Sequence, residues 1–224
     1  MGQLNSNRAV PSVFPFMGTL SHTRALYLDV EQQCWGGDEK PEGFHHDIIQ
    51  IGLVEADLQN LYITRHEGFI VRPAKINISA FCTELTGITE EQVRRAARFS
   101  ERISTIVRAY GPGSKLCFTW GDDARDIANA CLDSQIRDPF NFCNLAWLYR
   151  CSFGIKRNVG LVNALKSFGL EFEGRQHDAM WDAYNTARVH MAMIERLRQA
   201  GPLFLPENSE STTPDGITHH GEVC

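Results

Sequence analysis

The segment Arg24–Glu31 reads RALYLDVE, an apolar run that ends in two acidic residues. The run is too short and too rich in strand-forming residues for a helix, so it indicates a buried strand. Because side chains alternate along a strand, Asp29 and Glu31 project from one face, whereas Val30 points into packing on the other. Two carboxylates on one face can bind a divalent cation through oxygen. Taken alone, the pair also fits a solvated turn at a strand end.

A second acidic cluster, HDAMWD, occupies residues 177–182. From Asp178 to about residue 197, apolar residues recur at spacings of three and four, which predicts an amphipathic helix. Asp178 is a natural N-cap, Asp182 lies on one flank, and His177 directly precedes the helix. An imidazole, with a pKa of about 6.5, can accept a proton from water near neutrality. The alternative is a loop histidine that contacts nothing.

Between these clusters lies FTWGDD, residues 118–123, where a predicted strand gives way to a predicted helix. Asp122 suits the N-cap of that helix, and Asp123 then offers a free carboxylate. A purely structural alternative is that both acids oppose the helix dipole favourably. The three acidic clusters together form a candidate metal site.

The order of these motifs resembles the DEDDh group of DnaQ-like 3′-to-5′ exonucleases. The residues that carry the resemblance are Asp-x-Glu, an acid after Trp-Gly, and a His with an Asp five positions on. The Cys34-Trp35 pair, the run DIIQIGLVEA and the segment FCTELTGIT over 81–89 resemble the Eri-type branch in particular. The resemblance spans about residues 24–197, and the combination is far more specific than any single motif.

The resemblance implies a role for each matching residue. Two Mg²⁺ or Mn²⁺ ions would be held by Asp29, Glu31, Asp123 and Asp182, and His177 would activate the attacking water. One nucleotide would then leave from the 3′ end of single-stranded RNA or DNA in each cycle. Candidate substrate contacts are Val30, Leu85 and Thr86, together with Arg175, which lies close enough to His177 in the chain to reach a phosphate.

The middle motif departs from the family pattern. An alignment without gaps on common Eri-type members places the catalytic Asp at Ala124, which cannot bind metal, whereas a shift of one residue restores Asp123. We therefore take Asp123 as the ligand, with Asp122 as the second choice. The alternative is a module that keeps the fold, has lost catalysis and binds nucleic acid or a protein partner.

The periodicities predict an α/β fold, which the resemblance identifies as a single RNase H-like domain with a mixed five-stranded sheet flanked by helices. Strands are expected near 24–30, 47–56, 60–71, 115–119 and 140–143. Helices are expected near 79–86, 89–97, 100–110, 145–151 and 159–169, after Asp122, and from Asp178.

Length and composition agree with one domain. The 224 residues, 43% of them hydrophobic, can bury one substantial core. We expect a flexible segment over 1–22, the exonuclease domain over 23–203 and a disordered acidic tail over 204–224. No run approaches the length that crosses a bilayer, so we expect no membrane association and a cytoplasmic protein.

Charge and cysteines exclude further classes. Without the four acids beyond Pro206, the formal net charge of −5 falls to about −1, so the remainder does not repel nucleic acid strongly. The seven cysteines show no Cys-x-x-Cys spacing, which argues against zinc and disulfide frameworks. Most lie in apolar stretches and are expected to be small buried hydrophobes, with Cys224 exposed.

Overall fold

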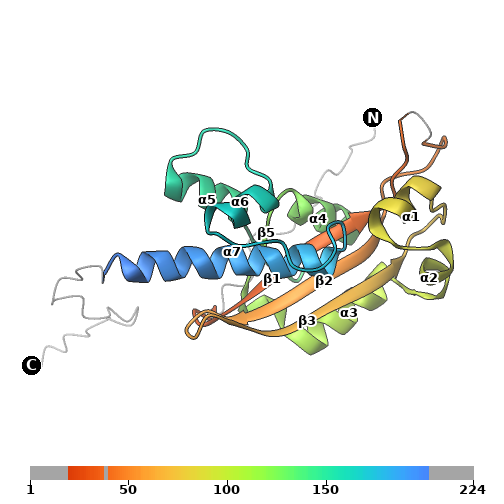
Figure 1. The fold of residues 1–224 in the computed structure, drawn as a ribbon. Coiled ribbons are helices and arrows are strands. Elements are labelled where there is room, and N and C mark those ends of the chain that lie inside the picture. The colour runs from red at the N-terminus through yellow and green to blue at the C-terminus, as the bar shows by residue number, and fades with distance from the viewer. Residues whose placement is uncertain (1–19, 38–39, 202–224) are drawn as a thin grey trace, which may run out of the picture.

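The computed structural model describes residues 20–37 and 40–201 (Figure 1). The expectations for most of the N-terminal segment, for the acidic tail and for Cys224 lie outside these residues, and the domain boundaries stay predictions. The elements follow one another along the chain in this order: β1 (Arg24–Gln32), β2 (Ile48–Asp57), β3 (Tyr62–Arg72), α1 (Ala80–Thr86), α2 (Glu90–Arg95), β4 (Ala97–Arg98), α3 (Phe99–Tyr110), the 3-10 turn η1 (Pro112–Ser114), β5 (Leu116–Thr119), α4 (Asp123–Asp133), β6 (Asn141–Asn144), α5 (Leu145–Phe153), α6 (Leu161–Ser167) and α7 (Ala179–Gln199).

One mixed sheet organises the described residues, in the strand order β4-β3-β2-β1-β5-β6. Strands β1, β2 and β3 form an antiparallel meander, whereas β5 and β6 run parallel to β1. The mixed sheet predicted from the sequence is confirmed, and its five strands correspond to β1, β2, β3, β5 and β6. The observed sheet has six strands because β4 adds a short sixth strand at one edge.

Strand β4 occupies a place where the sequence predicts the end of a helix. The helix expected over 89–97 stops at Arg95, and Ala97 and Arg98 extend to pair with the end of β3. The next helix begins at once because the carboxylate of Glu101 accepts the backbone N–H of Arg98 at 2.8 Å. Tertiary pairing thus overrides the helix propensity of the two alanines at 96 and 97.

The alternation of β1 divides the core into two layers. Leu26 and Leu28 pack on the side covered by α3 and α4, whereas Ala25 and Tyr27 pack on the side covered by α5, α6 and α7. All four side chains are essentially inaccessible to solvent. Figure 1 shows α7 lying along the sheet over β1 and β2, with α5 and α6 beside it. Asp29 and Glu31 continue the row of Ala25 and Tyr27, so they project toward α7.

Helix α7 approaches the sheet so closely that only glycine fits beneath its first turn. Gly52 of β2 pairs with Asp29 on one side and with Gly68 of β3 on the other. A Cβ atom at Gly52 would lie 1.9 Å from the carbonyl oxygen of Ala179. At Gly68 the nearest atom of α7 would be the Cβ of Met180, at 3.4 Å. The row Asp29–Gly52–Gly68 therefore seats the start of α7 directly beside the acidic end of β1.

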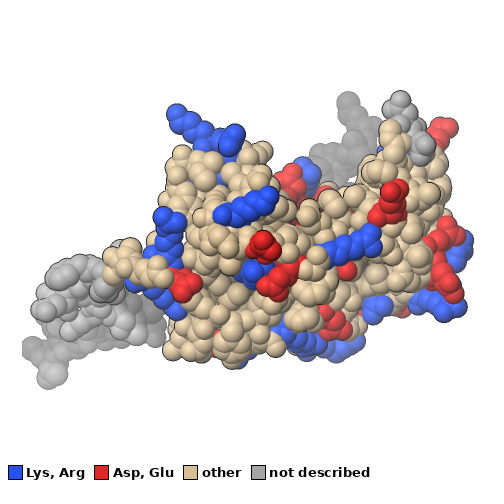
Figure 2. Space-filling view, in the orientation of Figure 1, with Lys and Arg blue, Asp and Glu red and all other residues tan. Residues whose placement is uncertain are grey.

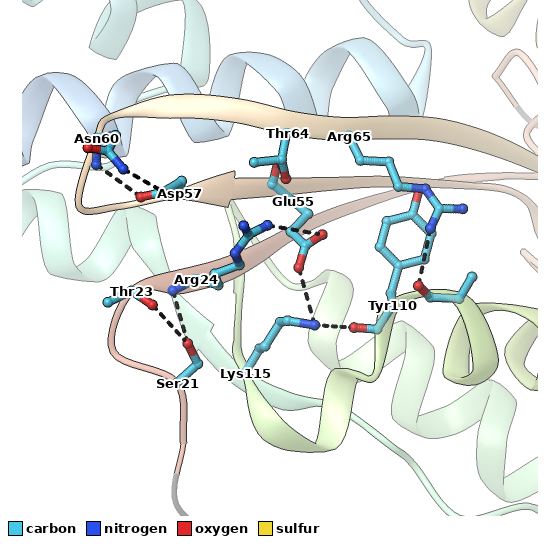
Figure 3. A network of polar contacts seen from close by, with 11 residues as sticks. Ser21, Thr23, Arg24, Glu55, Asp57, Asn60, Thr64, Arg65, Tyr110 and Lys115 are labelled. Atoms are coloured by element: carbon cyan, nitrogen blue, oxygen red, sulfur yellow. Dashed lines mark hydrogen bonds and ion pairs between the residues drawn. The ribbon is translucent and has the colours of Figure 1, made fainter.

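A polar network joins β1, β2 and β5 at the end of the sheet remote from these acids (Figure 3). Glu55 of β2 lies 3.2 Å from the ammonium of Lys115 and 4.0 Å from the guanidinium of Arg24. Lys115 also donates to the backbone oxygen of Tyr110, whose ring lies 4.0 Å beneath the guanidinium of Arg65. Because Lys115 and Glu55 are largely buried, this pair fixes the start of β5 more firmly than an exposed ion pair would.

Three of the six described cysteines are buried as expected, whereas the exposure of Cys151 on α5 was not expected. Cys82, Cys117 and Cys131 are buried, Cys34 and Cys143 are partly buried, and Cys151 is exposed, all of them as free thiols. Across residues 20–37 and 40–201, no helix combines the length and the apolar character that crossing a membrane requires.

The tight contact at Gly52 gives the first testable prediction. Gly52→Ala should destabilise the fold by about 3 kcal/mol or more, because the new methyl group meets backbone atoms that cannot rotate away. Urea unfolding of the purified protein measures this loss. Gly68→Ala is the matched control, because its methyl group meets only a side-chain amide at 3.2 Å and a methylene carbon at 3.4 Å. Equal losses in the two variants would contradict the proposed seat of α7.

Candidate metal centre and catalytic site

Two of the candidate ligands, Asp29 and Glu31, lie near the end of β1. Asp29 pairs with Gly52 and Glu31 with Gln50, and a register irregularity follows directly after Glu31. Both carboxyl groups are partly buried and face the first turn of α7. The sheet therefore fixes their backbone positions, and the irregularity ends the regular strand just beyond them.

Asp182 reaches the same place from the first turn of α7. As expected, Asp178 caps this helix: its side chain accepts the backbone N–H of Met180 at 3.1 Å. Buried Gln50 fastens the cap to the sheet, because its amide nitrogen donates to Asp178 at 3.0 Å and its amide oxygen accepts the N–H of Ala179 at 3.1 Å. The side chain of Gln50 thus binds both the capping carboxylate of Asp178 and a backbone N–H at the helix start that has no partner within the helix.

Carboxylate oxygens of Asp29, Glu31 and Asp182 lie within 4.8 Å of one another. The Oδ2 atom of Asp182 is buried and has no hydrogen-bond partner within the described part of the chain. Buried polar atoms are nearly always paired, and oxygen donors of this kind suit a hard divalent cation. The donor set therefore fits Mg²⁺ or Mn²⁺.

The electrostatics of the cluster point the same way. Burial raises the pKa of Asp29 well above its usual range, and repulsion from Asp123, Asp182 and Glu31 raises it further. Burial, followed by the charge of Asp182, raises the pKa of Glu31 to about 8. The pKa of Asp182 rises to about 6 through burial, partly offset by hydrogen bonding from the backbone of His177. Several carboxylates are thus crowded together, and a divalent cation bound among them would reduce the repulsion between their negative charges.

The structure separates the two aspartates of the middle motif. Asp123 accepts the backbone N–H of Val30 at 3.3 Å, which places its carboxylate beside β1, and burial raises its pKa to about 6. Asp122 occupies the N-cap position of α4 but makes no capping hydrogen bond, contrary to the expectation. Its exposed carboxylate pairs instead with Arg125 at 3.3 Å. Only Asp123 adjoins the acidic cluster, although it does not belong to the group of three within 4.8 Å.

His177 is exposed on the loop that precedes α7, and its backbone adopts the left-handed conformation with φ 60°. Residues other than Gly, Asn and Asp adopt this conformation at a cost, and such strain often marks functional sites. Within the described residues its ring makes no hydrogen bond to another side chain. The exposed ring is accessible from solvent, and its role as a base stays a prediction.

The loop before His177 is tied down on two sides. Asn185 of α7 is buried and binds both the N–H and the carbonyl oxygen of Glu173, at 3.1 and 2.8 Å. Arg175 donates to the carbonyl oxygens of Glu84 and Leu85, at 2.7 and 3.2 Å, at the end of α1. The guanidinium that we expected to meet a phosphate thus bridges the loop to α1, and the phosphate contact stays a prediction.

The remaining candidate substrate contacts differ in accessibility. Leu85 lines an open cavity of about 560 Å³ with Phe81, Phe172 and the loop 174–176. Thr86 is buried, and its hydroxyl donates to the Cys82 carbonyl oxygen and accepts the N–H of Ile88. The side chain of Val30 packs against the core, and its N–H is used by Asp123. Of these three residues, Leu85 is placed best for a ligand.

Sequence reasoning missed three residues that assemble the site. Gly52 lies in the interior of a strand, where an isolated glycine signals a close backbone approach. Gln50 is a polar residue in an otherwise apolar run, which could have indicated a buried hydrogen-bonding role. Asn185 carried no comparable signal, because its partner Glu173 lies in an irregular loop whose path the sequence does not predict.

A larger cavity of about 680 Å³ opens on the opposite side of the sheet, between α3, α4 and the end of β3. None of the candidate site residues lines this cavity.

The fold and its acidic site define a class of metal-dependent nucleases, and comparison with known proteins agrees. Residues 26–190 match the model of the exonuclease family RNase_T, so the chain belongs to this exonuclease family. Its relatives place it with the Eri-type branch of the DEDDh group, which confirms the resemblance found in the sequence.

Relatives of known name share about a quarter to a third of the aligned residues. ERI1 exoribonuclease 2 of Danio rerio is 31% identical over 201 residues, which cover 75% of this chain and 34% of that protein. The 3′-5′ exoribonuclease 1 of Mus musculus is 28% identical over 182 residues, covering 75% of this chain and 52% of that protein. A probable 3′-5′ exonuclease of Bacillus subtilis (strain 168), KapD, is 26% identical over 178 residues, covering 78% and 85%. The chain thus spans about half or less of the first two relatives.

Solved structures show the same fold. The nuclease domain of 3′hExo, a DEDDh family member bound to rAMP, superposes with a TM-score of 0.70 at 26% identity, covering 80% of this chain and 95% of that one. A 3′-exonuclease that recognises a histone mRNA stem-loop superposes with a TM-score of 0.69 at 26% identity, covering 78% and 82%. The predicted RNase H-like fold class is therefore confirmed.

The crowded charges of the cluster give a second prediction. The pKa of Asp182, about 6, lies above the usual 3.8, so folding favours the protonated carboxyl. The ionised carboxylate of Asp182 therefore destabilises the folded state fully above about pH 6 and not at all below about pH 4. In EDTA at pH 8, Asp182→Asn should stabilise the protein by about 1 to 3 kcal/mol, and the gain should vanish at pH 4.

Thermal unfolding with and without Mg²⁺ measures both parts of this prediction. Mg²⁺ should raise the melting temperature of the wild type and leave that of Asp182→Asn nearly unchanged. Asp133→Asn, at an exposed position on α4, is the control and should behave as the wild type does. A variant that is destabilised in EDTA, or that keeps the full response to Mg²⁺, would refute the shared cation site.

Proposed function

We propose that this protein is a metal-dependent 3′-to-5′ exonuclease that releases nucleoside monophosphates from single-stranded RNA or DNA. The observation that carries the proposal is the convergence of Asp29, Glu31 and Asp182 within 4.8 Å, with one buried oxygen left unpaired. Family membership and the names of the relatives support the reaction and its direction.

The acidic residues would bind the metal ions together. Asp29, Glu31, Asp123 and Asp182 would hold two Mg²⁺ or Mn²⁺ ions, and the position of Asp123 beside Val30 supports its inclusion. Two divalent ions in such a site activate the attacking water and stabilise the charge on the incoming and leaving oxygens of a phosphodiester displacement.

His177 would act as the general base. Its exposed ring lies on the loop that leads into Asp182, so a ring nitrogen can accept the proton of the attacking water as the phosphorus–oxygen bond forms. The oxygen of the penultimate nucleotide leaves and takes a proton from solvent. The ties made by Asn185 and Arg175 keep the loop in place, so substrate meets a base whose backbone is already positioned.

The cavity beside Leu85 suits the terminal nucleotide. Phe81, Leu85 and Phe172 offer apolar surface for a base, and the loop 174–176, which lines the cavity, leads directly to His177. Its volume, about 560 Å³, lies in the range of small-molecule sites. Seated there, the base would leave its phosphate directed toward the acidic cluster. The cytoplasmic location expected from the sequence stays a prediction.

An assay with 5′-labelled oligonucleotides tests the proposal. Purified protein with Mg²⁺ or Mn²⁺ should shorten single-stranded RNA or DNA from the 3′ end, leaving a ladder of labelled products, and EDTA should stop the reaction. Asp29→Asn should lower the rate at least about 100-fold, because it removes one of the three converging carboxylates that would bind the metal ions. Asp133→Asn should retain the wild-type rate. Binding without shortening under every metal condition would favour the catalytically impaired module instead.

The two aspartates of the middle motif provide a matched pair of variants. Asp123→Ala should lower the rate by several orders of magnitude, because its carboxylate adjoins the cluster. Asp122→Ala loses only an exposed pair with Arg125 and should change the rate less than about 3-fold. Single-turnover rates with the same oligonucleotide compare the two. A larger loss in Asp122→Ala would overturn the assignment of Asp123.

A further inference from the structure

One continuous part of this chain carries positive charge without any acidic residue, although the formal net charge of the whole chain is −5. Between Asp138 and Glu171 the sequence contains no acidic residue, yet it contains Arg150, Lys156, Arg157 and Lys166. This stretch folds into β6, α5, the connection 154–160 and α6. We call the part from residue 145 to residue 167 the α5–α6 lobe. A surface with several cations and no acids attracts a polyanion.

The connection 154–160, which carries Lys156 and Arg157, is held in place by hydrogen bonds. Arg150 of α5 donates to the carbonyl oxygen of Lys156 at 2.8 Å, to the side chain of Asn158 at 2.7 Å and to the carbonyl oxygen of Ile155 at 3.4 Å. Its guanidinium therefore fixes the course of the connection. Lys156 and Arg157 are exposed, and neither forms an ion pair with any residue in the described part of the chain. Their charges remain available to a ligand.

Exposed aromatic rings accompany these cations. Trp147 is 64% exposed and Phe153 is 40% exposed, although large aromatic side chains are usually well buried. The guanidinium of Arg150 lies 5.5 Å from the ring of Trp147, and that of Arg196 lies 5.8 Å from the ring of Phe153. Aromatic faces next to cations are what nucleic-acid bases and their phosphates bind, because bases stack on the rings while phosphates meet the charges.

The lobe is fastened to the segment that carries Asp123. Asn144, the N-cap of α5, donates to the carbonyl oxygen of Gly121 at 2.8 Å, and the indole N–H of Trp120 donates to the carbonyl oxygen of Val159 at 3.1 Å. In Figure 2, basic side chains project from the part of the molecule where Figure 1 draws α5 and α6. These two hydrogen bonds therefore hold the lobe against the segment that leads to Asp123.

We propose that the α5–α6 lobe is a second contact surface for the nucleic-acid substrate, which binds phosphates and bases upstream of the 3′ end. Lys156 and Arg157 contact phosphates, and Trp147 stacks on a base. The proposal rests on the exonuclease function proposed above. A nucleic-acid strand is favoured as the occupant because the lobe combines unpaired cations with exposed rings and has no acidic residue.

The test compares two variants of the lobe with matched controls. The first variant carries Lys156→Gln and Arg157→Gln, and its control carries Arg95→Gln and Arg108→Gln, which remove the same charge from exposed positions on α2 and α3. The second variant is Trp147→Ala, with Tyr62→Ala, an exposed aromatic of β3, as its control. Unchanged circular dichroism spectra and melting temperatures establish that each variant is folded.

Two measurements decide the outcome. Fluorescence anisotropy in EDTA gives the Kd for a labelled 20-nucleotide single strand at several salt concentrations, and steady-state assays with Mg²⁺ give kcat and KM for that strand and for a dinucleotide. Trp147→Ala should raise Kd and KM for the long strand about 5-fold or more. The double lobe variant should weaken binding to a similar degree and lower the salt slope of log Kd by about 1.4, the value for two single-strand phosphate contacts.

Neither lobe variant should change kcat, nor kcat/KM for the dinucleotide, which is too short to reach the lobe. The proposal is overturned if the lobe variants bind the long strand as the wild type does, if the controls weaken binding equally, or if the dinucleotide is affected to the same degree. Loss of the exonuclease function itself would look different: the wild type would hydrolyse neither substrate. In that case, weaker binding of the long strand by the lobe variants alone would still support the lobe as a nucleic-acid surface.

Discussion

The structure depends on the contact between the first turn of α7 and the strand beneath it. Gly52 has no side chain, so the backbone of Ala179 rests against β2, and the same sheet row brings Asp29 next to that contact. Gln50 then fixes the rotation of the helix by binding the cap and the N–H that follows it. A side chain at position 52 would separate the two elements that supply the acidic residues. The convergence of the acidic cluster is thus a direct result of close backbone packing.

The acidic cluster is held together against its own charge. Burial raises the pKa values of all four acids, and repulsion within the cluster raises those of Asp29, Glu31 and Asp182 further, so the fold supplies the energy that keeps the acids close. That energy comes from the two apolar layers on either side of β1 and from the pairing of three antiparallel strands. The far end of the sheet helps as well, because the buried pair of Glu55 and Lys115 fixes the parallel strand β5, whose other end leads to Asp123.

Much of this arrangement could be predicted from the sequence, because the informative residues act locally. Alternation along RALYLDVE placed Asp29 and Glu31 on one face, and the helical spacing after Asp178 placed Asp182 in a first turn. What the sequence could not provide was the set of long-range partners. The hydrogen bonds of Arg175 to the end of α1 were not foreseen, and Asp122, which was expected to cap a helix, pairs with Arg125 instead. Such choices depend on which atoms the folded chain brings within reach.

The left-handed backbone of His177 has a consequence for how this protein changes over time. Holding φ at 60° costs an L-residue about 1 kcal/mol, a penalty that glycine does not bear. Stability alone would therefore favour replacement of this histidine, and the general-base role proposed for its ring would oppose that replacement. A descendant that no longer cleaves its ligand would be expected to carry glycine or asparagine at this position before its core changes. With the general-base role proposed for His177, the identity of residue 177 in related chains is expected to separate catalytic members from non-catalytic ones.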